Sequence, residues 1–75
     1  MNNNDRFTIA MRTNPLEAAE IAIDFSAGCG SRANAWSWAN RAIDAAREAG
    51  VTLDAGNLSW PELDSMKAQL KAVRP

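Results

Sequence analysis

Two short segments of the chain carry the same signature of a helix start, and they constrain where helices can begin. Residues 14–17 (Asn-Pro-Leu-Glu) and 59–62 (Ser-Trp-Pro-Glu) each place a polar capping side chain first and a glutamate three positions later, with a proline between. The cap oxygen accepts hydrogen bonds from free amides of the first turn, and proline lacks an amide that would need a partner. Gly50 lies between the two signatures and is typical of a helix end. The sequence therefore predicts helices with well-defined ends.

The pattern of apolar residues sets expected bounds for three helices. We expect them over about residues 15–27, 31–49 and 60–73, with Ser31 capping the second. The middle helix has only a narrow polar stripe, so it should be contacted on two sides. Trp60 and Leu63 should face the core at the start of the third helix. The prediction is an all-α fold in which residues 1–75 form a single small helical domain.

Residues 1–13 are expected to form an extended arm ahead of these helices. Within the arm, Phe7, Ile9 and Met11 alternate with other side chains, which is typical of a short, half-buried strand over residues 6–12. The chain contains no second alternating segment that could pair with it. A strand here would therefore have to pair with something outside its own protomer.

Composition excludes most enzyme chemistry. The chain has no His, no Tyr and a single Cys, Cys29, so the usual bases, proton shuttles and zinc ligand sets are missing and no intrachain disulfide can form. Glu17, Glu20 and Asp24 are expected on a solvated helix face. The glycine-rich turn over residues 28–31 lacks the lysine and the spacing of a phosphate-binding loop. We expect no enzyme activity, cofactor, metal or small-molecule substrate.

Charge and hydropathy bear on location and partners. The net charge of −1 gives no overall attraction to nucleic acid or to anionic membranes. No run approaches the roughly 20 apolar residues of a membrane span, and the first residues lack the apolar segment of a signal peptide. We therefore expect a cytoplasmic protein that does not enter a membrane.

Trp36 and Trp38 are the most unusual local feature of the sequence. Because the two residues lie two positions apart on a helix, their side chains point about 160° apart and cannot enter one small core from the same side. Either both are buried within one protomer, or one is an exposed anchor at a protein interface, where Trp is enriched. We name Trp36, Trp38 and Arg41 as candidate partner-binding residues. The wide apolar face of the middle helix in so short a chain also predicts a homodimer.

Basic residues around the expected strand support a second interpretation. A short strand, a helix, a turn with Gly30 and Ser31, and a second helix together resemble the ribbon–helix–helix repressors. The resemblance covers residues 6–49 and implies a dimer whose paired strands enter the DNA major groove. It would assign the nucleic-acid contacts to Arg6, Thr8, Arg12 and Arg32.

Two function hypotheses follow. The first is a non-enzymatic regulatory or inhibitory protein that acts by protein–protein contact, of the kind encoded by phages and mobile elements. The alternative is a dimeric DNA-binding transcriptional regulator of the ribbon–helix–helix type. We favour the protein partner because the acidic segments 14–30 and 51–64 carry no basic residue and would repel a phosphate backbone.

Overall fold

Local capping explains where the chain becomes helical. The computed structural model describes residues 2–73, in which four α-helices occur: α1 (Asn3–Thr13), α2 (Pro15–Ala27), α3 (Arg32–Glu48) and α4 (Leu63–Val73). The Asn14 side chain accepts a hydrogen bond from the Glu17 amide at 3.3 Å, and the Ser31 hydroxyl accepts one from the Asn34 amide at 3.2 Å. The all-α prediction is confirmed, and the expected bounds of α2 and α3 agree with the structure to within one residue.

Gly50 ends α3 as the sequence predicts. Its φ of 80° lies in the left-handed region that glycine adopts without a steric penalty. The Gly50 amide donates to the Arg47 carbonyl and the Val51 amide donates to the Ala46 carbonyl, each at 2.9 Å. These two bonds form a Schellman motif, which satisfies carbonyls of the last turn and turns the chain away from the helix.

The expected extended arm and its strand over residues 6–12 are wrong, because residues 3–13 form the helix α1. The Asn2 side chain caps this helix by accepting a hydrogen bond from the Asp5 amide at 2.9 Å. A lone strand would leave its backbone groups without partners, whereas a helix pairs them internally. Phe7, Ala10 and Met11 are the more buried positions of α1, and their spacing of three and four residues fits a helix better than alternation does.

The start of the last helix also differs from the prediction. Helix α4 begins at Leu63 rather than near residue 60, and Ser59 does not act as its cap. The Ser59 carbonyl instead accepts a hydrogen bond from the Trp36 indole, and the Glu62 amide donates to the Ala55 carbonyl at 3.0 Å. These bonds tie residues 59–62 to the preceding loop, and only the Glu62 carbonyl joins the helix, where it accepts a hydrogen bond from the Met66 amide at 3.0 Å. Trp60 is 48% exposed, so its expected place in the core is wrong.

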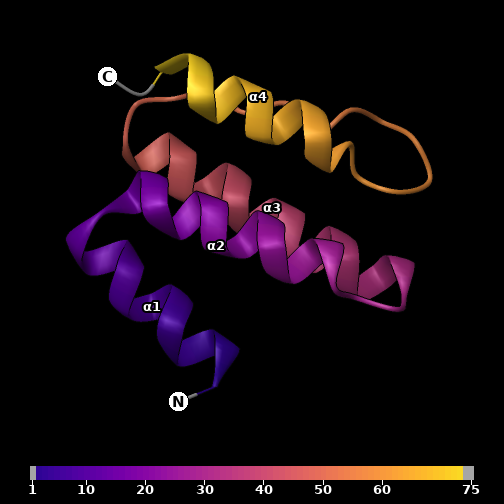
Figure 1. The fold of residues 1–75 in the computed structure, drawn as a ribbon, viewed down its shortest axis with the longest axis horizontal. Helices are drawn as coiled ribbons and strands as arrows, with labels where there is room; N and C mark the ends of the chain where they lie inside the picture. Colours follow the sequence, from indigo (N-terminus) through magenta and orange to yellow (C-terminus); the bar gives the residue numbers. More distant parts are fainter. Residues whose placement is uncertain (1, 74–75) are drawn as a thin grey trace.

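The helices form a flat molecule around the α2–α3 pair. Helix α1 lies along one side of this pair and α4 along the other, and the loop between α3 and α4 extends to the end of the molecule where α2 turns into α3 (Figure 1). The Cα positions span 30 × 30 × 15 Å. A slab of this thickness has little interior, and the most enclosed helix is α2, which contacts the other three.

Alanine dominates the core between α2 and α3. Alanines with no exposed surface line the contact on both helices, and they are Ala18, Ala19, Ala22, Ala35, Ala39, Ala42, Ala45 and Ala46. Small side chains let two helices approach closely, and they remove less apolar area from water than larger ones. Ser26 lies in the same contact, where its hydroxyl donates to the Ala35 carbonyl at 2.6 Å. The largest fully buried side chains are Ile23, Met66 and Leu70.

Candidate functional site

The loop between α3 and α4 is held in place by polar and apolar contacts. The Gln69 side chain accepts a hydrogen bond from the Asp54 amide and donates one to the Asp54 carbonyl, both at 2.8 Å. Leu53 and Ala55 on either side are each only 4% exposed. Helix α4 therefore fixes the first half of this loop through a two-point contact with its backbone.

The second half of the loop presents large apolar side chains to solvent. The Trp36 indole donates a hydrogen bond to the Ser59 carbonyl at 2.9 Å, which ties the loop to the first turns of α3. The residues on either side of Ser59 point outward, with Leu58 61% and Trp60 48% exposed. Trp36 itself is partly buried. We call Trp36, Leu58 and Trp60 the loop surface.

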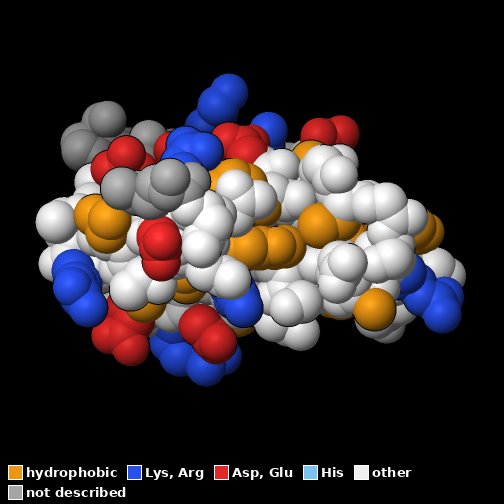
Figure 2. Space-filling model, turned by 90° about the horizontal axis from the view of Figure 1, so that it is seen from below, with side chains coloured by type: hydrophobic (Ala, Val, Ile, Leu, Met, Phe, Trp, Pro, Cys, Tyr) orange, Lys and Arg blue, Asp and Glu red, His pale blue; other side chains and the backbone are white. Residues whose placement is uncertain are grey.

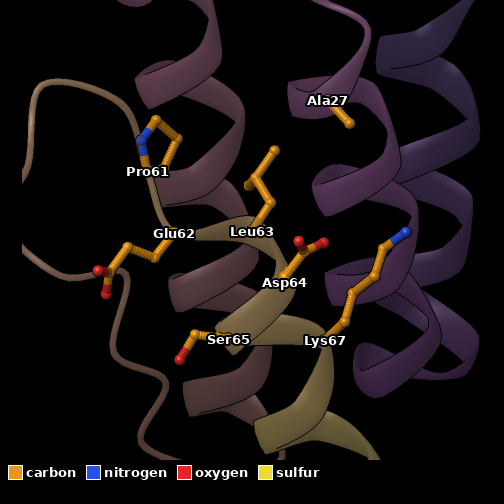
Figure 3. A pocket seen from close by; sticks show the side chains of 7 residues that line it. All are labelled: Ala27, Pro61, Glu62, Leu63, Asp64, Ser65 and Lys67. Atoms are coloured by element: carbon orange, nitrogen blue, oxygen red, sulfur yellow. The ribbon is translucent and has the colours of Figure 1, made fainter.

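An open hollow adjoins the loop surface at the start of α4. It has a volume of about 720 Å³ and is lined by Ala27, Pro61, Glu62, Leu63, Asp64, Ser65 and Lys67. Ala27 comes from the end of α2, and Lys67 reaches across toward that helix (Figure 3). Pro61, which lines the hollow, directly follows Trp60 in the chain. Charged and apolar side chains share its lining.

A separate aromatic cluster joins α1 to the α2–α3 pair. The Trp38 ring meets Phe7 of α1 and Phe25 of α2 edge to face, at centroid distances of 5.8 and 4.9 Å. Two guanidinium groups cover this cluster, Arg41 at 4.3 Å from the Trp38 ring centre and Arg6 at 5.4 Å from that of Phe25. Aromatic pairs and cation–π contacts each stabilise by about 0.5–1.5 kcal/mol. The cluster therefore helps to hold α1 on the rest of the fold.

The candidate partner-binding residues divide between these two places. Trp36 belongs to the loop surface, whereas Trp38 and Arg41 lie in and over the aromatic cluster, where Arg41 also donates a hydrogen bond to the Asn4 side chain. The divergence of the two indoles follows from their spacing on one helix. Partner binding by Trp38 and Arg41 stays a prediction. Sequence reasoning missed Leu58 and Trp60, because the signature at residues 59–62 indicated a helix start.

The candidate nucleic-acid-binding residues lie on two helices. Arg6, Thr8 and Arg12 are exposed on α1, and Arg32 is exposed at the start of α3. Because residues 6–12 are helical, the paired ribbon implied by the resemblance to ribbon–helix–helix repressors is absent from this fold. Figure 2 views the side that carries α1 and shows acidic side chains next to the basic ones. A DNA-contacting surface is usually dominated by basic groups.

The acidic face of α2 meets the basic face of α4. Lys67 lies 3.0 Å from the Asp24 carboxylate, and a hollow of about 290 Å³ between the helices is lined by Glu20, Asp24, Lys67 and Lys71. Both partners of the ion pair are half exposed or more, so the pair contributes little to stability. The uneven placement of charge along the chain thus has a use within the fold, which the sequence alone did not indicate.

Two further findings concern metals and membranes. Within residues 2–73, no three or more Cys, Asp or Glu side chains gather in a way that could hold a metal ion. None of the helices in this part of the chain has both the length and the apolar content needed to cross a membrane.

Comparison with protein-family models, with curated proteins and with solved structures finds no match to this chain.

Proposed function

We propose that this chain is a non-enzymatic regulatory or inhibitory protein that acts by contact with another protein, and that the loop surface makes this contact. The observation that supports the proposal is the exposure of Leu58 and Trp60 on one loop, at 61% and 48%. Keeping two such side chains in water forgoes hydrophobic stabilisation, which contact with a partner would recover.

The anchoring of the loop supports the same proposal. Gln69 fixes the loop backbone at Asp54, ahead of the exposed residues, and Trp36 fixes it at Ser59, between Leu58 and Trp60. A loop that is already ordered loses less conformational entropy on binding, so more of its contact energy contributes to affinity. Trp is also among the residues that contribute most to protein interfaces.

The test compares the native chain with a loop variant as baits in a lysate of the native host. Leu58→Ser combined with Trp60→Ser removes the exposed apolar groups without touching the buried core. We expect the native chain to retain a specific protein that the loop variant loses, while circular dichroism shows equal helix content for both.

A control variant separates this contact from general adhesion of apolar surface. Val73 is 46% exposed and lies on another element, so Val73→Ser should retain the same protein. Equal retention by the native chain and the loop variant would contradict the proposal. Capture of no protein at all by the native chain would contradict it as well.

A further inference from the structure

The groove between α1 and α2 is a second surface, distinct from the loop surface. It has a volume of about 290 Å³ and is lined by Arg6, Ile9, Ala10, Thr13, Glu17 and Ile21. Ile9 is 46% exposed there and Ile21 is partly exposed. Helix α2 runs back along α1 after the turn at Asn14 (Figure 1). Glu17 lies three residues after this turn and Arg6 eight residues before it, so the two lie toward opposite ends of the groove.

The order of charges along this groove is self-complementary. The Arg6 guanidinium lies 5.4 Å from the ring centre of Phe25, which places it beside that position of α2. Glu17, Ile21 and Phe25 are spaced four residues apart, about 6 Å each along the helix axis. Ile21 therefore lies midway between the acidic end and the basic end, and the centre of the groove is apolar.

We propose that the occupant of this groove is a second copy of the chain, packed about a two-fold axis through the apolar centre. A two-fold operation exchanges the two ends, so Arg6 of each protomer faces Glu17 of the other while the isoleucines meet in the middle. Neither side chain is engaged in an ion pair with another residue of the 2–73 segment. The groove thus offers one donor and one acceptor to an identical partner, which fixes the register as well as the contact.

The apolar face of α3, which predicted a dimer from the sequence, is covered within one protomer. The wide apolar face of α3 suggested a partner, but α2 covers its alanines and α1 contacts Trp38 within one protomer. Helix α1 therefore covers part of the α3 surface where the sequence predicted contact with a second copy. The groove between α1 and α2 keeps partly uncovered isoleucines beside Arg6 and Glu17.

Charge-reversal variants test the pairing directly. Their masses are measured by light scattering after size exclusion, at protein concentrations from micromolar to millimolar. The native chain should reach about twice the 8.1 kDa of one chain as concentration rises. Arg6→Glu alone and Glu17→Arg alone should each remain at the mass of one chain, because like charges then meet at both ends. An equimolar mixture of these two variants should form a heterodimer, because each end again joins a guanidinium to a carboxylate.

Matched controls use charges outside the groove. Arg32→Glu and Glu48→Arg make the same charge changes at exposed ends of α3, where each new charge also suits the helix dipole. Both should dimerise as the native chain does. A native chain that stays at single-chain mass throughout the series would overturn the inference, as would dimers of either single variant or a mixture that fails to associate. The loop variant Leu58→Ser with Trp60→Ser should still dimerise, so this result is independent of the proposed function.

Discussion

At the scale of single residues, the conformation of Gly50 follows from the local sequence, whereas the environment of Trp60 depends on a distant contact. The sequence places Gly50 after a periodic apolar stretch, and the left-handed backbone that glycine adopts there confirms the helix end. Trp60 follows a serine and precedes a proline, which indicated a capped helix. Its real environment depends on a bond from Trp36 to Ser59, 23 positions apart, which no local pattern contains.

The left-handed conformation at Gly50 has a measurable consequence. Gly50→Ala should destabilise the fold by about 1–2 kcal/mol, because a Cβ is disfavoured at positive φ. Thermal unfolding should shift down by roughly 4–8 °C per kcal/mol in a domain of this size. Gly30→Ala is the control, since Gly30 does not have a positive φ and an added Cβ there meets nothing within 4 Å. Equal melting temperatures for the two variants would contradict the assigned helix end.

Truncation should cost much more stability at one tryptophan than at another. Trp38→Ala removes a partly buried ring that contacts two phenylalanines, and it should lower the free energy of unfolding by about 3 kcal/mol. Trp60→Ala removes a ring that is 48% exposed, and it should cost less than about 1 kcal/mol. Urea unfolding followed by circular dichroism measures both. A larger loss at Trp60 than at Trp38 would restore the core role that the sequence suggested.

At the scale of helices, the sequence predicts most closely those helices whose start, apolar face and end are all marked within their own segment. Helices α2 and α3 carry a cap, a periodic apolar face and a glycine stop within their own segments, so the sequence predicted them closely. In the short segment of α1, the apolar residues fit both the alternation of a strand and the spacing of a helix. Its helical state is supported by the Asn2 cap and by the contact of Phe7 with Trp38, which is 31 positions away.

The candidate site was less predictable than the helices for the same reason. Trp36 could be proposed as partner-binding from its position on α3, but Leu58 carries no signal of its own in the sequence. Its exposure follows from the bonds that Gln69 and Trp36 make to the loop backbone. Such contacts join distant segments, and only the three-dimensional structure reveals them.

The close approach of α2 and α3 makes a prediction for the alanine core. Ala39 has no exposed surface, so Ala39→Leu forces additional volume between the two helices and should cost about 1–3 kcal/mol or more. Ala33→Leu is the matched control, because Ala33 is exposed on the same helix and its side chain can extend into solvent. Thermal unfolding compares the two, and similar stabilities would mean that the helices are not packed through these alanines.

At the scale of the whole molecule, the flat shape gives the chain two separate surfaces, for which we propose different uses. The loop surface lies where the α3–α4 loop is tied to the start of α3, and the groove lies on the outer side of α1 and α2. In the proposed arrangement, the groove joins two copies and each copy presents one loop surface. A dimer would therefore contact its partner protein at two places, which raises the apparent affinity when both can be engaged together.

Amide hydrogen exchange of the chain, alone and bound to the protein that it captures, tests the central claim most directly. The account predicts that binding slows exchange in residues 49–62 and in the first turns of α3 around Trp36, while amides in the outer helix α1 exchange as before. The result that would contradict the account is unchanged exchange in the loop with slowed exchange in α1, because the partner would then contact the opposite side of the molecule.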